Sequence, residues 1–371
     1  MTILVVAVSA RMLAELAAAD GYNVIALDRF GDVDLRAIAS GATAANSDAM
    51  VALASDVEAD AVVYGAGFEN RPDLVARLAD GRELLGTPAE LLAAVRDPWA
   101  VGAAARAAGA RAPETRPDCD VPAPEPGAWL RKPACGGGGR GVRSWAGGGL
   151  ARTEILQRRI RGLSCSAVAI GDGRRATVLG LTEQLHRRPG FGWMGNVTPP
   201  RLPDGELAGL DGQLRAVCDE VAARFGVRGA FGVDAIWDGR YAWVLEVNPR
   251  PPAALELFGP GTFEAHVLGA RGAGLPRAGT PAGSGAFGRQ NPEATRCERV
   301  KLVLYASRDL RAPDPGWWPA GLVHDIPHAG ETIKRGAPVC TLISVDGGVP
   351  ELAGRGARLL TAVNEPVLAR G

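Results

Sequence analysis

Apolar and polar residues alternate in blocks over the first 90 residues. Residues 2–8 and 23–28 form two apolar runs, and between them residues 11–19 repeat apolar side chains with the period of a helix. A further strand is expected at residues 61–64, after another helical segment. Strands separated by helices predict a small parallel sheet with helices on its faces, that is, a Rossmann-like α/β domain over residues 1–90.

The pattern changes in the middle of the chain. Residues 88–108 are helical, and residues 112–127 are rich in proline and acid, which is typical of a connector. Short strands and turns are expected from residue 128 to 185, followed by an amphipathic helix at 207–225 and two strands within 228–250. This succession predicts an α+β unit that is distinct from the first domain.

Glycine, proline and alanine dominate residues 273–293, as in a linker, and the residues after it alternate like short strands. The fold class is therefore α/β followed by α+β, in four parts. These are the α/β domain at 1–90, an α+β domain at 91–272 with a lid at about 112–157, the linker at 273–293, and a β-rich domain at 294–371.

Charge and cysteine usage narrow the class of protein. Lysine and arginine together number 41, as do aspartate and glutamate, so there is no basic excess for nucleic-acid phosphates or an anionic membrane. The six cysteines are scattered, without a zinc or disulfide spacing. No apolar stretch is long enough to span a membrane, and MTILVVAVSA lacks a basic leader. We expect a cytoplasmic protein that binds neither nucleic acid nor membrane.

The stretch WLRKPACGGGGRGV, residues 129–142, joins the end of a strand to a glycine loop. Lys132 is one of only three lysines in the chain. Backbone amides of a glycine loop can donate to phosphate oxygens, and an ammonium group beside them suits the same ligand. A flexible hairpin tip is the alternative, since the order of lysine and glycines is not that of a P-loop. The loop glycines are Gly136, Gly137, Gly138, Gly139 and Gly141.

Three oxygen-bearing side chains interrupt the two apolar strands of residues 228–250. Asp234 lies inside the first strand, and Glu246 and Asn248 lie in the second, which ends in LEVNPR. An unpaired carboxylate among apolar residues is costly, and two carboxylates with an amide oxygen are ligands that suit Mg²⁺ or Mn²⁺. For any single acid a salt bridge to an arginine is the simpler explanation, but the three together favour a metal site.

The register of these two strands tests the metal hypothesis. With a two-residue turn at Asp238 and Gly239, Asp234 would face away from Glu246. The hypothesis therefore predicts an odd loop or a bulge that places Asp234 opposite or diagonal to Glu246. Arg250, just after the strand ends, would then reach over the same face toward a phosphoryl group or an anionic intermediate.

A further segment, ILQRRIRG, follows an apolar strand and turns into the next one. Its extended backbone could face a purine edge, with Gln157 available to a hydroxyl or an amide.

In this order, the lysine and glycine loop, the QRRIRG segment, and an aspartate twelve residues before ExNxR resemble the ATP-grasp superfamily. The resemblance implies an ATP-grasp fold, in which the nucleotide lies between two α+β subdomains and a carboxylate is activated as an acyl phosphate. It implies ATP and Mg²⁺ as cofactors, with Lys132 and Arg250 as catalytic residues. Asp234, Glu246 and Asn248 would hold the metal. The nucleotide would contact Lys132, the glycine loop, Gln157, Arg158, Arg159 and Ile160.

Two features depart from the superfamily pattern. Many relatives carry a nucleotide-contacting lysine after an aspartate near position 97, whereas this chain has RDPWAV with Pro98 and Trp99 there. The hinge often carries acidic residues that contact ribose, whereas this one is basic. Weaker ATP binding, or compensation by a residue such as Arg96, is the implied consequence.

Two more segments, DRFGDVD at 28–34 and VHDIPHAGETIKRGAPVCTLIS at 323–344, are similar to a narrower group, the predicted ATP-dependent carboligases related to biotin carboxylase. That group is associated with one-carbon metabolism that uses methanopterin- or methanofuran-type cofactors. The resemblance implies an acid or an amine that belongs to such a cofactor.

The main hypothesis is an ATP- and Mg²⁺-dependent ligase that joins a small-molecule acid to an amine through an acyl phosphate. One alternative is a carboxylase-like enzyme that uses bicarbonate through carboxyphosphate, and another is an ATP-binding regulatory subunit without turnover. A homodimer is the candidate assembly. The four histidines are dispersed, and His186, Glu183 and Asn196 are the candidates for the substrate side.

Overall fold

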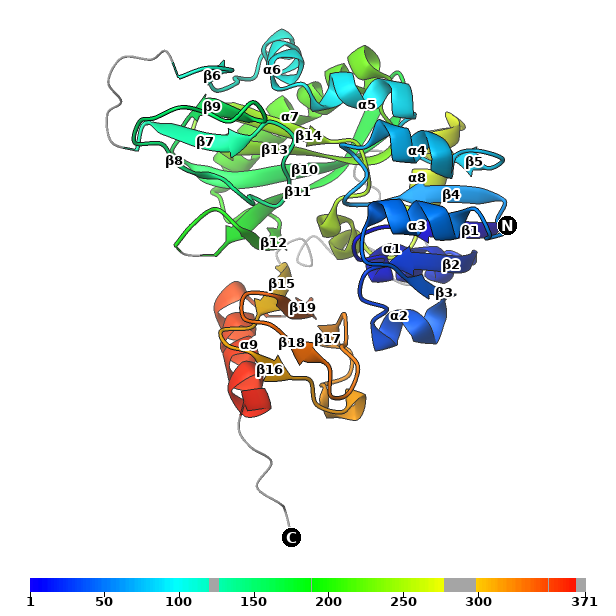
Figure 1. The fold of residues 1–371 in the computed structure, drawn as a ribbon. Coiled ribbons are helices and arrows are strands. Elements are labelled where there is room, and N and C mark those ends of the chain that lie inside the picture. Colours follow the sequence, from blue (N-terminus) through cyan, green and yellow to red (C-terminus); the bar gives the residue numbers. More distant parts are fainter. Residues whose placement is uncertain (120–126, 188, 277–297, 346, 365–371) are drawn as a thin grey trace.

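The computed structural model describes residues 1–119, 127–187, 189–276, 298–345 and 347–364 (Figure 1). Most of the expected linker, from residue 277 to 293, lies outside these residues. The chain forms a first α/β unit, a large antiparallel sheet, a small sheet that we call the lid, and a tail that adds strands to the large sheet. The predicted α/β and α+β fold class is confirmed.

The first unit is a five-stranded parallel sheet with the order β3-β2-β1-β4-β5. Helix α1 (Arg11–Ala19) and strands β2 (Asn23–Asp28) and β4 (Ala61–Tyr64) have the predicted bounds, whereas β1 (Thr2–Val6) ends two residues early. Its apolar runs are continuous because both faces of a parallel sheet are covered. The remaining elements are α2 (Val33–Ile38), β3 (Ser40–Thr43), α3 (Ser47–Ala54), α4 (Pro72–Leu78) and β5 (Glu83–Leu84).

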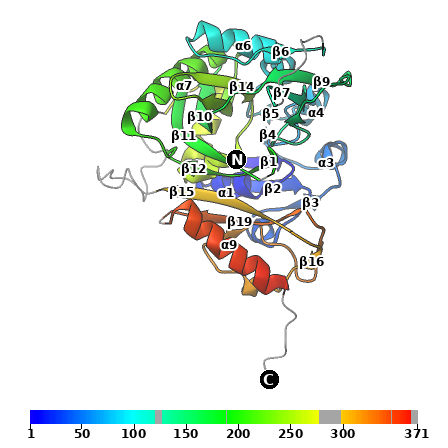
Figure 2. The same ribbon diagram turned by 90° about the vertical axis from the view of Figure 1, so that its left-hand side faces the viewer.

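Eight strands form the large antiparallel sheet, in the order β14-β13-β10-β11-β12-β15-β19-β17. Strand β12 pairs with β15, so three tail strands continue the sheet of the middle unit. Figure 2 shows the lid strands above the first unit and the tail below it. The strands are β10 (Leu163–Asp172), β11 (Ala176–His186), β12 (Trp193–Thr198), β13 (Arg228–Trp237), β14 (Ala242–Asn248), β15 (Arg299–Tyr305), β17 (Val323–His324) and β19 (Pro338–Ser344).

The two faces of the large sheet differ in polarity. Helix α7 (Asp204–Phe225) packs its apolar side against β10, β11 and β13 and contributes to the core there. Side chains alternate along a strand, so Ser166 and Asp234, which pair with each other, point to the opposite face. Helix α8 (Thr262–Arg271) covers the apolar part of that face. The polar part is buried as well, and it therefore needs hydrogen-bond partners or a ligand.

The lid is a four-stranded sheet with the order β6-β9-β7-β8. Lys132 and Gln157 share one face of the β7-β9 pair. The other face packs a small apolar cluster of Trp129, Trp145 and Leu156. The lid strands are β6 (Thr115–Arg116), β7 (Trp129–Pro133), β8 (Arg143–Ser144) and β9 (Glu154–Arg158).

The helical stretch before the lid is broken into α5 (Ala89–Arg96) and α6 (Pro98–Ala107). Asp97 caps the second helix, because its Oδ1 accepts a hydrogen bond from the backbone N–H of Trp99 at 2.9 Å. Pro98 occupies the first helical position, where a backbone N–H would have no acceptor within the helix, so a proline is tolerated there. The departure at Pro98 therefore has a local reason: this residue begins a helix.

The tail carries strands, as expected, and also a helix, α9 (Val349–Asn364), that its sequence pattern did not predict. Leu352 on this helix is buried in the tail core. The described residues include no helix with the length and apolar character of a membrane span. The short elements that complete the fold are the 3-10 helices η1 (Ala253–Phe258) and η3 (Pro315–Trp317) and the strands β16 (Leu310–Arg311) and β18 (Thr332–Ile333).

Candidate active site

A bulge in strand β14 brings two carboxylates face to face. Asp234 pairs with Glu246, but the next pair is Ala235 with Val244, so Leu245 is the extra residue. The irregularity that the metal hypothesis required is therefore confirmed. An unbroken strand would place Leu245 on the core face together with Val247, whereas the bulge places Val244 there instead.

Asp234 is the most constrained of the three expected metal ligands. Its Oδ1 accepts a hydrogen bond from Gln184 Nε2 at 2.9 Å, and its Oδ2 accepts one from Asn248 Nδ2 at 3.0 Å. Burial raises the pKa of Asp234, and the facing carboxylate of Glu246 raises it further. Two carboxylates that oppose each other's ionisation form a place where a cation is favourable.

Lys132 reaches the same place from the lid. Its Nζ donates to Gln157 Oε1 at 3.2 Å, and Gln157 Nε2 donates in turn to Thr115 Oγ1 at 3.2 Å. Burial lowers the pKa of Lys132, whereas Glu246 and Asp234 raise it, so the ammonium group lies within electrostatic reach of both carboxylates. The structure thus brings together the lysine and the acids that lie about a hundred residues apart in the sequence.

The glycine loop is held against the loop that follows β11. The backbone N–H of Trp193 donates to Gly138 O at 3.0 Å, and a Cβ atom at Gly139 would lie only 1.9 Å from Phe191 O. Gly138, Gly139 and Gly141 have φ angles of 61°, 68° and 76°, which favour glycine. The glycine run therefore meets specific backbone requirements, which a merely flexible tip would not impose.

Arg250 is held by a residue that the sequence reasoning missed. Its Nε and Nη2 both lie 3.2 Å from Glu69 Oε1, and the backbone N–H of Gly67 donates to Glu69 Oε2 at 2.7 Å. Burial alone would raise the pKa of Glu69, but Arg250 holds it below its usual value. The sequence did contain a signal for Glu69, because this acid follows the carboxyl end of the parallel strand β4. Ligands of open parallel sheets bind at that edge.

Arg96, at the end of α5, points into the same place. Its Nη1 donates to Val247 O at 2.7 Å, and its Nη2 lies 3.8 Å from Glu246 Oε2. The side chain is almost fully buried, with 8% of the residue exposed. Arg96 therefore adds a cationic side chain beside the expected metal ligands, and its compensation for Pro98 stays a prediction.

The hinge residues are placed unevenly. Gln157 is buried inside the site, whereas Arg158 lies on the opposite face of the lid, with its guanidinium carbon 6.0 Å from the ring centroid of Trp129. The guanidinium carbon of Arg159 lies 5.7 Å from an aromatic ring in the loop after β11. Ile160 is half-buried. Of the four, Gln157 alone has its side chain beside the lysine and the acids.

Of the substrate-side candidates, Asn196 lies on the polar face of the sheet, whereas Glu183 pairs with Cys165 and therefore points to the opposite face, which α7 covers. Asn196 Nδ2 donates to Thr182 Oγ1 at 2.7 Å, and the Thr182 hydroxyl lies 2.8 Å from that of Ser166. Glu183 is buried and forms an ion pair with Arg201. The contacts of Asn196 extend the hydrogen-bonded polar region across β10, β11 and β12, away from the metal ligands.

The two segments that are similar to the narrower group lie against each other. The backbone N–H of Val33 donates to Ile326 O at 2.8 Å. The Asp34 carboxylate accepts hydrogen bonds from the backbone N–H groups of Asp325, at 2.8 Å, and Ile326, at 3.0 Å. These segments join the first unit to the tail, so their occurrence together has a packing reason.

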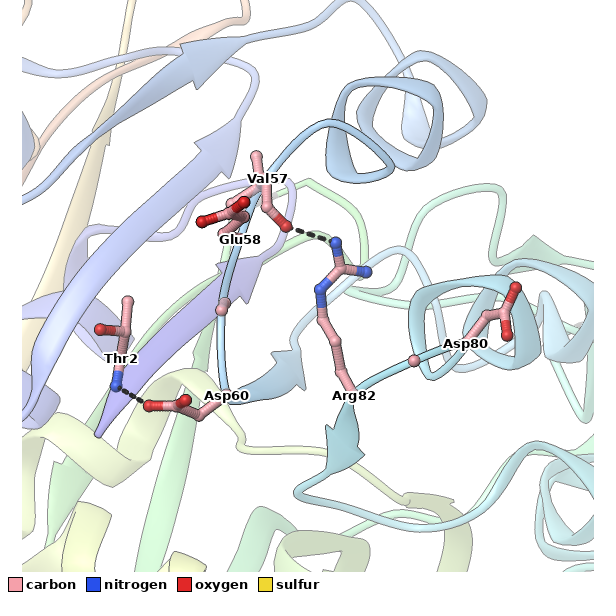
Figure 3. Close-up of a pocket in the computed structure, with 8 residues that line it drawn as sticks. Thr2, Val57, Glu58, Asp60, Asp80 and Arg82 are labelled. Carbon is pink, nitrogen blue, oxygen red and sulfur yellow. Dashed lines mark hydrogen bonds between the residues drawn. The ribbon is translucent and has the colours of Figure 1, made fainter.

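A separate pocket lies at the amino ends of β1 and β4 (Figure 3). Within it the backbone N–H of Thr2 donates to Asp60 Oδ2 at 2.7 Å, and Arg82 Nη2 donates to Val57 O at 2.6 Å. Ligands of open parallel sheets bind at the carboxyl ends of the strands, so this end of the sheet is the unfavoured one. We assign these hydrogen bonds a structural role, in holding neighbouring segments of the first unit together.

The donor set fits the groups that the sequence predicted. Two carboxylates and an amide oxygen are hard ligands of the kind that Mg²⁺ takes together with phosphate oxygens. Three cationic side chains, Lys132, Arg96 and Arg250, surround them and would complement a triphosphate. The arrangement can therefore hold a metal nucleotide and orient its terminal phosphate.

Comparisons with known proteins agree with this geometry. Residues 95–254 match a family model described as an ATP-grasp domain. Residues 95–254 are therefore similar to an ATP-grasp domain, and every residue that we assign to metal or phosphate lies within this range. A comparison with curated proteins finds no match.

Solved structures share the fold over nearly the whole chain. Pyruvate carboxylase from Rhizobium etli is 16% identical with a TM-score of 0.71, over 99% of this chain but only 39% of its own. N5-carboxyaminoimidazole ribonucleotide synthetase from Thermus thermophilus is 18% identical, with a TM-score of 0.66 over 99% of this chain and 100% of its own. The biotin carboxylase domain of the 2-oxoglutarate carboxylase from Hydrogenobacter thermophilus is 15% identical, with a TM-score of 0.68 over 98% and 90%. The predicted ATP-grasp fold is confirmed.

Proposed function

We propose that this protein is an ATP- and Mg²⁺-dependent ligase that activates a carboxylate as an acyl phosphate and joins it to an amine. The observation that carries the proposal is the pairing of Asp234 with Glu246 across the bulge, within electrostatic reach of Lys132. A purely structural cluster would place a cationic side chain between the two acids. Here the acids instead face each other, and burial with their mutual repulsion raises the pKa of Asp234.

Each group of residues would have a separate role that follows from its position in the site. Asp234, Glu246 and Asn248 would hold Mg²⁺, which when bound neutralises phosphate charge and aligns the phosphate oxygens. Lys132 and the amides of the glycine loop would hold the terminal phosphate. Arg250, kept in place by Glu69, would steady the anionic carboxylate and the tetrahedral species that forms when the amine attacks.

The lid contributes by excluding water. The hydrogen bond from Trp193 to Gly138 O holds the glycine loop against the large sheet. An acyl phosphate hydrolyses when water reaches it, so a closed loop protects the intermediate until the amine arrives. In this mechanism catalysis depends on positioning and charge neutralisation rather than on an acid or base side chain.

Two finer assignments belong to the proposal. One is that the acid or the amine is part of a one-carbon-carrier cofactor precursor, which is supported only by the similarity of residues 28–34 and 323–344 to the narrower group. The other is a homodimer, supported by the dimer named for the Hydrogenobacter domain.

Use of bicarbonate is the second candidate function. It is favoured by the solved structures of similar fold, because the Hydrogenobacter domain is described in complex with MgADP and bicarbonate. In that reaction carboxyphosphate would take the place of the acyl phosphate, and the same metal and phosphate ligands would serve.

Oxygen transfer separates these functions. We would incubate the protein with MgATP, hydroxylamine as a trapping amine, and either a panel of acids labelled with ¹⁸O in the carboxylate or ¹⁸O-labelled bicarbonate. The ligase proposal predicts ¹⁸O in the released phosphate and a hydroxamate from one class of acid, without dependence on bicarbonate. Label arriving from bicarbonate alone would establish the carboxylase. Binding of MgATP without ADP formation under any mixture would overturn both and leave a regulatory subunit.

A further inference from the structure

Arg96 differs in its contacts from Arg250, the other arginine that we assign to the site. Arg250 pairs with a carboxylate at 3.2 Å, whereas Arg96 has none at that distance among the described residues. It is the last residue of α5, and Asp97 and Pro98 start α6 immediately after it, so the chain turns at this point. The residue is 8% exposed although an arginine is rarely buried without a carboxylate in direct contact. Its nearest carboxylate, that of Glu246, lies at 3.8 Å.

The guanidinium group instead bridges three separate parts of the chain. Its Nε donates to Asn70 Oδ1 of the first unit at 2.9 Å, and its Nη2 donates to Gly136 O of the glycine loop at 2.6 Å. Its Nη1 donates to Val247 O at 2.7 Å and lies 3.4 Å from Asn248 Oδ1, both in β14. One planar group thus joins the first unit, the lid and the metal-binding strand.

We propose that Arg96 is a positioning residue that couples closure of the glycine loop to the arrangement of the metal ligands. This inference rests on the proposed function, since it concerns the same nucleotide site. Arg96 lies between Gly136, which belongs to the glycine loop after lid strand β7, and Asn248 and Glu246, which would hold the metal. When the loop opens, the guanidinium loses its Gly136 acceptor and a buried donor is left unsatisfied, which is unfavourable.

Three properties of arginine are needed for this role. The planar fork offers five N–H donors in fixed directions, so it can hold acceptors on three elements at once. Its partners are mostly neutral carbonyls, so the positive charge stays available to a triphosphate. It also lies within electrostatic reach of Lys132, so two cationic groups together attract an anion to the site.

The test compares Arg96→Lys and Arg96→Met with Arg82→Met. Arg82 is a matched control, because it also donates to backbone carbonyls, Ala54 O at 2.5 Å and Val57 O at 2.6 Å, but in the remote pocket of Figure 3. Binding of a non-hydrolysable ATP analogue is measured by calorimetry at a series of Mg²⁺ concentrations. In parallel, the alkylation rate of Cys135, which is exposed and directly precedes Gly136, reports loop closure through peptide mass spectrometry.

We expect the Mg²⁺ concentration for half-saturation to rise by at least about 10-fold in Arg96→Met, as for loss of a group that orients a metal ligand. Arg96→Lys keeps the charge but not the fork, so it should rescue analogue binding only in part. The analogue should protect Cys135 in the wild-type protein and in Arg82→Met, but not in either Arg96 variant.

Equal Mg²⁺ dependence and equal Cys135 protection in the Arg96 variants and in Arg82→Met would overturn the inference. If Arg96→Met does not fold, Arg96→Lys carries the same test. Failure of the wild-type protein to bind any nucleotide would instead refute the proposed function, so the two outcomes are distinguishable.

Discussion

Two clusters of buried charge lie in this molecule, and they are built in opposite ways. One joins the first unit to the tail; we call it the ionic cluster and define it as Arg11, Glu256, Lys301 and Asp325. The Arg11 side chain is 1% exposed and pairs with Glu256 and with Asp325, the latter at 3.0 Å. Lys301 Nζ lies 2.5 Å from Glu256 Oε2. Every charge in the ionic cluster therefore has an opposite charge in contact.

The other cluster is the candidate metal site, and the carboxyl pKa shifts differ between the two clusters. In the ionic cluster burial alone would raise the pKa of Glu256, but Lys301 and Arg11 hold this pKa below its usual value. In the metal site burial and a second carboxylate act in the same direction and raise the pKa of Asp234. In the ionic cluster every acid has a cationic side chain in contact. In the metal site Asp234 forms no ion pair among the described residues and faces a second acid, which favours binding of a cation. Burial of charge alone therefore does not identify a functional site; the two clusters differ in whether each buried carboxylate has a cationic side chain in contact.

The largest effect that tests this difference is expected in the ionic cluster. Replacement Glu256→Gln leaves Arg11 and Lys301 buried without their shared partner, which should lower the free energy of unfolding by about 4 kcal/mol. Chemical denaturation measures this change. Glu351→Gln is the control, because Glu351 forms an exposed pair with Arg355 and should cost less than about 0.5 kcal/mol. A small effect of Glu256→Gln would show that the cluster is not a structural element.

For Asp234 we expect a large loss of activity with little change in stability, unlike the large loss of stability expected for Glu256. Asp234→Asn removes a metal ligand and should reduce ADP formation at least about 100-fold, a change of about 2.7 kcal/mol in the activation barrier. The stability of the metal-free protein should change by less than about 1 kcal/mol, because the repulsion with Glu246 is lost together with the charge. A steady-state coupled assay and a thermal unfolding scan measure the two quantities. Strong destabilisation with retained turnover would mean that the acids are structural.

A third prediction concerns pH and a carboxyl group at the edge of the ionic cluster. Burial, with Asp325 next, raises the pKa of Asp32 from 3.8 to about 8. The folded protein therefore keeps a proton that the unfolded chain releases above pH 4, so this group's contribution to stability is complete below about pH 4 and is lost as the pH rises to 8. Asp32→Asn should be more stable than the wild type by at least about 2 kcal/mol at pH 8, and equally stable near pH 4. Denaturation at both pH values checks this, and a difference that does not vary with pH would contradict it.

The smallest effect is expected where the first unit touches the site. Glu69→Gln weakens the ion pair that orients Arg250, so kcat/KM for the acid should fall about 10-fold, while the affinity for the nucleotide stays the same. Glu114→Gln is the control, because Glu114 is an exposed acid that pairs with Arg116 in the lid. This replacement should leave both kcat/KM for the acid and the affinity for the nucleotide unchanged. Equal losses in nucleotide affinity and turnover would indicate that Glu69 acts on the phosphates instead.

Much of the fold followed from short-range patterns. The bounds of α1, β2 and β4 match because apolar runs and helical periodicity are local properties of the chain. Helix α9 was missed, since its glycines and its polar face weaken the same signal. The bulge was predicted only as a condition of the metal hypothesis, and the pairing register that fixes it is a long-range property.

The candidate site divides in the same way. Lys132, the loop glycines and the three metal ligands are recognisable because the chemistry requires those residue types near one another in a fixed order. Glu69 and the contacts of Arg96 were not readable, because each depends on a partner more than a hundred residues away or on another unit. The direction of Arg158, away from the site, depends on which face of the lid each residue takes.

By itself the sequence determined the elements of the first unit, the order of its chemical groups and the requirement for a bulge, because these depend on neighbours along the chain. The tertiary structure decided which buried charges neutralise each other and which are left to meet a cation. That decision depends on distances of a few ångströms between distant segments, over which electrostatic energies in a buried environment vary steeply.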